Sequence, residues 1–241
     1  MQKIVLVIPS YNNSSWYKQN LDSVISQNYP DYRVIYTDDA STDNTFSLVE
    51  NYVNEKRVRD KFTLIQNSER TGAMCNLYQM IHSCEDEEIV ATLDGDDWLN
   101  GDDALSKVSA AYSDGETLMT YGSYVDWPRN TRGCAKLVPQ HVINRNLYRK
   151  SPWCFSHLRT FKAKIFKELP KSDFQIDNKW MMSAWDLPIM FGIAEKSRGK
   201  FKYINDILYC YNNNNPLSDF KVRLSEQQHF ERIVRSRTPY M

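Results

Sequence analysis

The first half of the chain alternates continuous apolar runs with stretches in which apolar residues recur at helical spacing. The apolar runs predict strands at 3–8, 32–37, 62–66, 88–93 and 117–122. The amphipathic stretches predict helices after 14–15, from 44, over 72–82 and over 102–112. Strands that are apolar throughout are buried on both faces. The alternation therefore predicts an α/β fold with a mainly parallel sheet and helices on both faces.

The second half is less regular. We expect a long, partly mobile connection over 127–151 and ordered elements over 151–168 and 180–195, the latter helical. Short strands are expected at 201–204 and 207–211, and a terminal helix at 220–235. The chain is thus predicted to be a single domain with an irregular C-terminal region.

Polar residues gather where four of the expected strands end, at 10–13, 37–43, 67–70 and 94–97. Ligands bind at the carboxyl ends of the strands in open α/β sheets. The last group places Asp94, Asp96 and Asp97 directly after an apolar strand. Such like charges repel and raise one another's pKa, so we expect a cation there. A divalent metal that prefers oxygen fits best, and a solvated acidic turn is the alternative.

The overall composition of the chain limits the kinds of partner and the cellular location that we expect. The 241 residues carry 30 basic and 30 acidic side chains, so no overall field favours nucleic acid; the short basic stretch at 145–150 is expected to be a solvated loop. The five cysteines are scattered without a C-x-x-C pair, which predicts reduced thiols. No apolar run approaches the ~20 residues that span a bilayer, and Met1 leads almost directly into a strand. We therefore expect no signal peptide and a cytoplasmic protein.

Four stretches in order along the chain resemble family 2 glycosyltransferases. They are I-V-L-V-I-P-S-Y-N-N (4–13), S-Q-N-Y-P-D-Y-R-V-I-Y-T-D-D-A-S-T-D-N-T (26–45), N-S-E-R-T-G-A-M-C-N (67–76) and L-D-G-D-D-W-L (93–99). The resemblance is strong over about 3–125 and looser beyond. It implies the GT-A fold and an inverting transfer of a sugar from a nucleotide-sugar donor, with a UDP-sugar expected.

The resemblance also implies a nucleotide site. Three residues are expected to line the base and ribose: Pro9, Ser10 and Tyr11. Asp39 would accept a hydrogen bond from a uracil-like base, with Asp38 beside it; turn formation is the alternative for both. Arg70 is a candidate contact to phosphate or base, because a guanidinium suits a bidentate anion, and a plain surface arginine is the alternative.

Asp94, Gly95 and Asp96 match the D-x-D motif of the family. By that match Asp96 would ligate Mn²⁺ or Mg²⁺ directly, and Asp94 would contact the ribose or the metal. Gly95 would let the backbone approach the donor closely. The metal would neutralise charge that develops on the departing diphosphate.

Asp186 matches the second acidic motif of the family, in which the acidic residue opens a helix. By that match it is the general base for the acceptor hydroxyl; an N-terminal capping aspartate, with Pro188 in the first turn, is the alternative. A polar and aromatic set supplies weaker candidates for contacts to the acceptor or diphosphate: Trp153, His157, Arg159 and Trp185. A packing role is the alternative for the histidine and the tryptophans.

These expectations divide the single domain into a nucleotide-sugar-binding half at 1–125 and an acceptor-binding half with a C-terminal helix at 126–241. The acceptor stays open between a glycan, a protein and a lipid. The segment at 229–241 could be a linker, a homodimer contact or a membrane-surface element. The chain lacks a Q-x-x-R-W motif, which favours transfer of one sugar over polymer synthesis. A sugar-phosphate nucleotidyltransferase and a non-catalytic nucleotide-sugar-binding module are the rival functions.

Overall fold

The computed structural model describes residues 2–241, apart from the side chains at 219 and 220. The strands are β1 (Ile4–Ser10), β2 (Tyr32–Asp38), β3 (Phe62–Gln66), β4 (Ile89–Thr92), β5 (Trp98–Leu99), β6 (Met119–Trp127), β7 (Thr131–Arg132), β8 (Ser156–Lys162), β9 (Gln175–Ile176), β10 (Lys179–Trp180) and β11 (Phe201–Asn212). The α-helices are α1 (Tyr17–Ile25), α2 (Thr45–Glu55), α3 (Ala73–His82), α4 (Ala104–Ala111), α5 (Gln140–Asn144), α6 (Ala163–Lys167), α7 (Asp186–Ser197), α8 (Asp219–Val222) and α9 (Leu224–Ser236). Short 3₁₀ helices are η1 (Arg59–Lys61), η2 (Tyr148–Lys150) and η3 (Lys171–Phe174).

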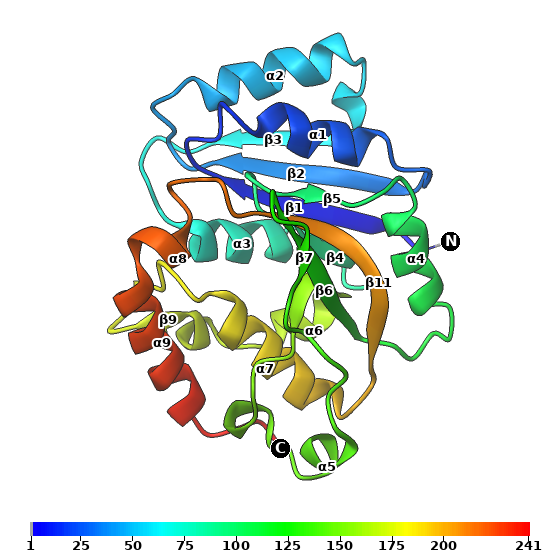
Figure 1. The fold of residues 1–241 in the computed structure, drawn as a ribbon, viewed down its shortest axis with the longest axis vertical. Helices are drawn as coiled ribbons and strands as arrows, with labels where there is room; N and C mark the ends of the chain where they lie inside the picture. The colour runs from blue at the N-terminus through cyan, green and yellow to red at the C-terminus, as the bar shows by residue number, and fades with distance from the viewer. Residues whose placement is uncertain (1) are drawn as a thin grey trace.

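One mixed sheet organises the domain, in the order β3-β2-β1-β4-β8-β6-β11-β5, with β7 added to β6. The predicted parallel arrangement holds across β3, β2, β1 and β4. Antiparallel pairs enter where β8 lies between β4 and β6, while β11 runs parallel to β6. The predicted α/β class is confirmed, and the sheet twists strongly between β1 and β6 (Figure 1).

Strand β1 explains why a continuous apolar run is needed here. Val5 and Val7 pack into one core cluster together with residues of α3. Ile4, Leu6 and Ile8 pack into a second cluster together with residues of α1 and α2. Successive side chains of a strand point to opposite faces, so both faces of β1 are buried between helices (Figure 1).

The second half is more ordered than its sequence pattern predicts. The expected mobile connection at 127–151 contains β7, α5 and η2. The two short strands expected near the end are one strand, β11, with register shifts between Tyr203 and Cys210. The helix expected from residue 180 begins at Asp186, because β10 and a turn precede it. The prediction missed β7, α5, η2 and β10 because elements of two to five residues are too short to show a hydrophobic period.

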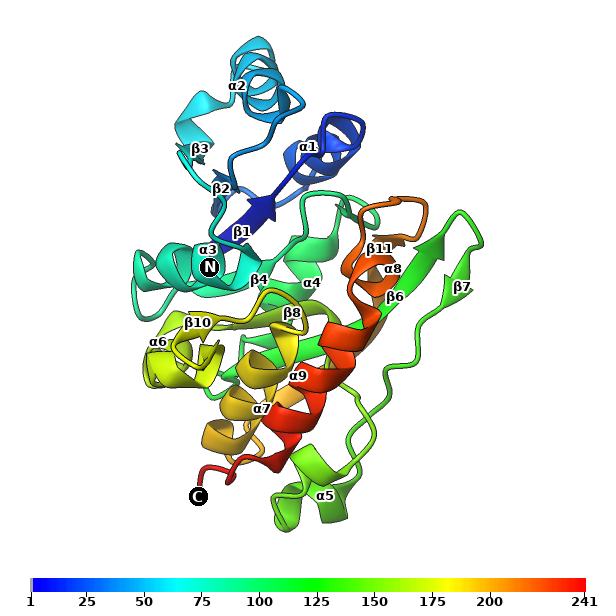
Figure 2. The ribbon, with the colours of Figure 1, turned by 90° about the vertical axis from the view of Figure 1, so that its left-hand side faces the viewer.

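The prediction that residues 145–150 form a solvated loop is wrong for Arg149. Its guanidinium is buried, with Nε 2.6 Å from Glu195 Oε1 and Nη2 2.9 Å from Glu195 Oε2. Arg149 Nη1 also donates to the Val234 carbonyl oxygen at 2.8 Å, and the Tyr240 amide donates to Glu195 Oε2 at 3.0 Å. These bonds join α7 to the C-terminal segment, and α9 runs along α7 (Figure 2). The segment at 229–241 therefore packs on its own domain.

The five cysteines are free in the structure. Within residues 2–241, no helix combines the length and the apolar character that crossing a bilayer requires. The boundary expected at residue 125 falls inside β6, so the two expected halves share one sheet.

Candidate active site

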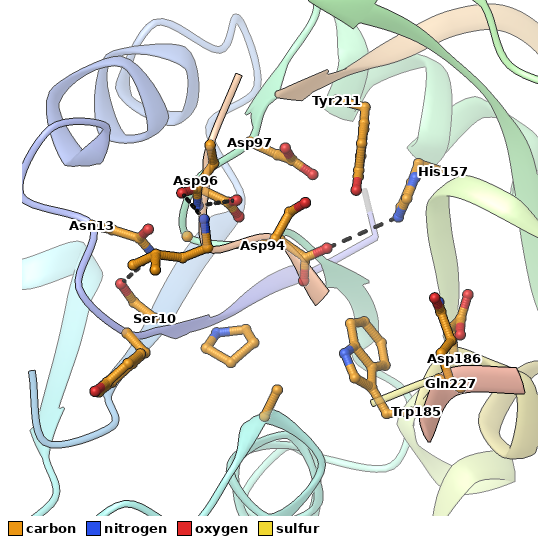
Figure 3. A pocket seen from close by; sticks show the side chains of 18 of the residues that line it. Ser10, Asn13, Asp94, Asp96, Asp97, His157, Trp185, Asp186, Tyr211 and Gln227 are labelled. Carbon is orange, nitrogen blue, oxygen red and sulfur yellow. Dashed lines mark hydrogen bonds and ion pairs between the residues drawn. The ribbon is translucent and has the colours of Figure 1, made fainter. Parts of the chain in front are cut away.

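A cleft of about 450 Å³ lies at the carboxyl ends of β1 and β4 and is closed by residues of β8, α7, β11 and α9. It collects residues far apart in the sequence (Figure 3). The predicted site residues that line it are Pro9, Ser10, Tyr11, Asp39, Arg70, Asp94, Gly95, Asp96, Trp153, His157, Arg159, Trp185 and Asp186. The fold thus brings the expected donor and acceptor residues to one cavity.

Asp38 does not line the cleft. It is fully buried at the end of β2, where its Oδ2 accepts a hydrogen bond from the Ser41 amide at 3.0 Å. This bond closes a turn, which is the ordinary structural role of an aspartate after a strand. The expected nucleotide contact of Asp38 is therefore replaced by support of the loop that follows β2.

Arg70 lies over Tyr11 on the donor side of the cleft. The guanidinium carbon is 3.7 Å from the centroid of the tyrosine ring. This is close cation–π geometry. It brings a planar aromatic group and a planar cation together where the resemblance expects a nucleotide base, and both side chains line the cavity.

Asp39 organises the loop that carries Arg70. Its Oδ1 accepts hydrogen bonds from Asn67 Nδ2 at 2.9 Å and from the Thr71 amide at 2.9 Å. Its Oδ2 accepts one from the Gly72 amide at 2.8 Å. Burial acts to raise the pKa of Asp39, but these bonds outweigh it and hold the pKa below the usual value. A carboxylate has about four acceptor positions, so Oδ2 retains capacity for one further donor.

Gly95 packs against the loop after β1. A Cβ atom built on it would lie 2.7 Å from both Ser10 Oγ and Asn13 Nδ2. Those two side chains are themselves hydrogen-bonded at 2.9 Å. The position therefore requires glycine for close contact with the β1 loop, in addition to the approach to a donor that the motif predicts.

The three carboxylates after β4 have different environments. Asp97 is almost fully buried and accepts hydrogen bonds from Tyr209 Oη at 2.6 Å and from the Asn212 amide at 2.7 Å. Burial raises the pKa of Asp97 well above its usual value, and the charges of Asp96 and Asp94 add to the effect. Asp97 thus anchors β11 to the D-x-D loop, and it lines the cleft together with Asp94 and Asp96.

Asp94 and Asp96 form the candidate metal site. Asp96 Oδ2 accepts a hydrogen bond from Asn215 Nδ2 at 2.7 Å, and burial raises the pKa of Asp96. No group of three or more His, Cys, Asp or Glu side chains is arranged to hold a metal within the described part of the chain. Two cleft-facing carboxylates fit Mn²⁺ or Mg²⁺ as an open site, because Mg²⁺ commonly takes one or two carboxylates plus water and substrate phosphates.

His157 lies between the carboxylates and two tyrosines of β11. Its ring stacks on Tyr209 at a centroid distance of 4.3 Å, and its Nε2 is 4.0 Å from Asp94 Oδ2. Burial, reinforced by the charge of Arg159, holds the pKa of His157 well below 6.5. The imidazole is therefore neutral at pH 7 and packs tightly, while remaining part of the cavity wall.

Asp186 begins α7, as predicted, and reaches the same cleft from the side opposite the D-x-D loop (Figure 3). Its Oδ2 lies 2.7 Å from Arg159 Nη2. The guanidinium carbon of Arg159 also lies 5.4 Å from the Trp185 ring centroid. The structure therefore brings the expected base, Asp186, together with two of the weaker candidates, and Arg159 forms an ion pair with it.

Several lining residues were missed. They include Asn76, Asp126, Tyr211, Asn215 and Gln227. The run of four asparagines that begins at the last residue of β11 was a signal that could have pointed to Asn215. No sequence pattern pointed to Gln227, because its role depends on where α9 packs.

Buried polar atoms without a partner concentrate around the cleft. Such atoms belong to five lining residues: Asn13 Oδ1, Asn76 Nδ2, Asp126 Oδ1, His157 Nδ1 and Ser218 Oγ. Buried polar groups are ordinarily hydrogen-bonded. Their gathering here is what a site for a polar ligand requires.

A parallel half-sheet whose strands end at a carboxylate-lined cleft, continued by a mixed half that closes this cleft, is the GT-A architecture. The family model of Glycosyl transferase family 2 matches residues 5–170. The chain belongs to this family.

Curated relatives extend well beyond this chain. The poly(ribitol-phosphate) β-N-acetylglucosaminyltransferase TarS of Staphylococcus aureus is 30% identical over 119 residues, 47% of this chain and 20% of that protein. The chondroitin synthase of Escherichia coli is 26% identical over 250 aligned residues, 97% of this chain and 32% of that protein. The chain therefore spans less than a third of either relative.

Solved structures share the fold. TarS residues 1–349 of S. aureus in complex with UDP-GlcNAc match with a TM-score of 0.64 and 20% identity, covering 89% of this chain and 59% of that one. The mannosyltransferase PcManGT of Pyrobaculum calidifontis, in complex with GDP-Man and Mn²⁺, matches with a TM-score of 0.66 and 22% identity, covering 98% and 65%. These matches confirm the predicted GT-A fold.

Proposed function

We propose that this chain is a metal-dependent, inverting glycosyltransferase that moves one sugar from a nucleotide-sugar to an acceptor hydroxyl. One observation carries the proposal: Asp94 and Asp96 line the same cleft as Asp186, from opposite sides. Asp94 and Asp96 would hold the leaving diphosphate, and Asp186 would hold the acceptor. The transferred sugar would then lie between the two. Direct displacement with inversion needs that arrangement.

The donor would bind at the carboxyl ends of β1 and β2. Tyr11 and Arg70 offer flat surfaces for a base, and the remaining capacity of Asp39 Oδ2 suits an N–H of a uracil. A UDP-sugar is our proposed donor, which the complex of TarS with UDP-GlcNAc supports. PcManGT, which shares the fold, is in complex with GDP-Man, so the choice between UDP and GDP has to be tested.

Asp94 and Asp96 would hold Mn²⁺ or Mg²⁺. When bound, the cation supplies Lewis-acid stabilisation of the negative charge on the diphosphate. Asn215 keeps Asp96 oriented through its 2.7 Å hydrogen bond. The complex of PcManGT with Mn²⁺ supports this choice of cofactor.

Asp186 would accept the proton of the acceptor hydroxyl. Arg159 holds one oxygen of this carboxylate, so the other is left for the acceptor. A positioned general base contributes about 10²–10⁴ in rate. Trp185 and Trp153 line the cleft nearby and offer apolar faces to a sugar ring. The acceptor can be the hydroxyl of a glycan, a protein or a lipid.

The first test is titration calorimetry of UDP, GDP and dTDP, each with and without Mn²⁺, on the wild type and on Asp96→Ala. We expect one nucleotide to bind in a metal-dependent manner and the variant to lose this binding. The absence of binding by all three nucleotides would contradict the proposal. Pyrophosphate release from a nucleoside triphosphate and a sugar phosphate would instead support the nucleotidyltransferase.

The second test measures sugar transfer to a panel of acceptors, chosen from what related proteins act on: poly(ribitol phosphate), chondroitin oligosaccharides and short glycans. Hydrolysis of the donor by water is measured alongside. Nucleotide binding without either reaction would favour the non-catalytic module.

A further inference from the structure

One face of α9 changes character where the helix passes the cleft. Gln227, Phe230 and Val234 are spaced i, i+3 and i+7, so they share the inward stripe of the helix. Val234 is fully buried, and Phe230 packs against the core. Gln227 continues the same stripe but lines the cleft. A polar residue thus stands where the packing pattern of the helix alone would favour an apolar one.

The side-chain amide of Gln227 has no hydrogen-bond partner among the described side chains and backbone. It points into the cleft on the side where Asp186 lies (Figure 3). A glutamine amide offers two donors and one acceptor oxygen. Polar groups that are partly withdrawn from water are ordinarily paired, so this amide is available to a ligand that fills the cleft.

Gln227 is held in place by the anchoring of α9. Ser183 Oγ donates to Glu226 Oε2 at 3.2 Å, which ties the start of the helix to the loop before Asp186. Arg235 Nη1 donates to the carbonyl oxygens of Arg149 and Ser151 at 2.9 and 2.8 Å. The start of α9 is therefore tied to the loop before Asp186, and its end is tied to η2 and Ser151.

We propose that Gln227 is a specificity-determining residue that recognises the acceptor, through a hydroxyl next to the one that Asp186 deprotonates. The proposal rests on the proposed function and adds the acceptor subsite to it. An amide that both donates and accepts suits the neighbouring hydroxyls of a sugar or polyol. Gln227 lies outside residues 5–170, so this part of acceptor recognition is specific to the C-terminal segment of the chain.

The test compares Gln227→Ala with Gln228→Ala. Gln228 is the next residue on the same helix but is exposed on its outer face, beside Glu231 and Arg232. Both variants lose the same atoms, so Gln228→Ala controls for effects on the helix. The measurements are UDP-GlcNAc hydrolysis by water, transfer from UDP-GlcNAc to the acceptor panel, UDP affinity and melting temperature.

For Gln227→Ala we expect the acceptor KM to rise about tenfold, the effect of losing ~1.4 kcal/mol of binding. Hydrolysis, UDP affinity and melting temperature should match those of Gln228→Ala. Equal transfer by the two variants would overturn the proposal. A parallel loss of hydrolysis and UDP affinity would also overturn it, because Gln227 would then serve the donor or the fold. A wild type that neither hydrolyses nor transfers the sugar of any UDP-, GDP- or dTDP-linked donor refutes both this proposal and the proposed function.

Discussion

Arg159 Nη2 lies 2.7 Å from Asp186 Oδ2, and this ion pair joins β8 to the first residue of α7 at the wall of the cleft. Arg159 is buried, and its Nε also donates to the Phe155 carbonyl oxygen at 3.2 Å. A guanidinium held at two points gives a carboxylate one fixed orientation. Arg159 therefore acts on Asp186, where the sequence pattern predicted a contact to diphosphate or acceptor.

Replacing Asp186 by Asn tests the base. We expect transfer to fall at least about 100-fold, because an amide cannot accept the acceptor proton. Nucleotide affinity should stay within about twofold of the wild type, since Asp186 lies away from the D-x-D loop. Steady-state transfer and calorimetry measure the two effects. Transfer within tenfold of the wild type would rule out Asp186 as the base.

Replacing Arg159 distinguishes two roles for this residue: orienting Asp186 and contacting the diphosphate. If it orients Asp186, Arg159→Gln should lower kcat about 10- to 100-fold and leave nucleotide affinity unchanged. Arg159→Lys should recover only part of the loss, because an ammonium keeps the charge but lacks the planar fork. A fall in nucleotide affinity with unchanged kcat would instead assign Arg159 to the diphosphate.

The buried pair of Arg149 and Glu195 predicts a stability effect. Glu195→Gln leaves the Arg149 charge buried without its partner, which should reduce the free energy of unfolding by about 3 kcal/mol. Urea denaturation measures this change. Glu168→Gln is the control, because Glu168 pairs with Lys196 of the same helix α7 but is 59% exposed, and exposed pairs contribute about 0–1 kcal/mol. Equal effects of the two variants would contradict the prediction.

Glu88 predicts a pH dependence. Burial alone would raise its pKa, but hydrogen bonds from Arg33 and the Glu85 amide outweigh burial and lower the pKa from 4.5 to about 2. As the pH falls, Glu88 therefore binds a proton in the unfolded chain at a higher pH than in the folded chain. The resulting stability is present above pH ~4.5, is lost progressively towards pH ~2, and amounts to about 3 kcal/mol.

Glu88→Gln should therefore be less stable than the wild type at pH 7, and the difference should shrink between pH 4.5 and 2. Denaturation curves at several pH values test this. Glu87→Gln is the matched control: its bonds to Lys162 and Lys164 also lower the pKa of Glu87 to about 2, but its side chain is 66% exposed. Solvent screens that pair, so its pH dependence should be weaker. A difference for Glu88→Gln that does not change with pH would refute the assignment.

The sequence by itself determined the parallel half of the fold and most of the candidate site. The strands β1 to β4 and the helices α1 to α4 follow from apolar periodicity, because each element buries a local, regular pattern. The polar groups after β1, β2 and β4 follow from their place at strand ends, since parallel strands end at one edge of a sheet. Asp94 and Asp96 could be singled out there without coordinates.

Only the tertiary structure decided how the second half closes the site. Arg149 is buried because it pairs with Glu195, and Arg159 faces Asp186 because it pairs with that carboxylate. These partners are 46 and 27 residues away along the chain, so a local sequence pattern does not reveal them. Asp38 and Asp39 are adjacent and identical in chemistry, yet one supports a turn and the other holds the loop of Arg70. Gln227 reaches the cleft because of the way α9 packs. Such roles depend on long-range contacts, which no local pattern of residues encodes.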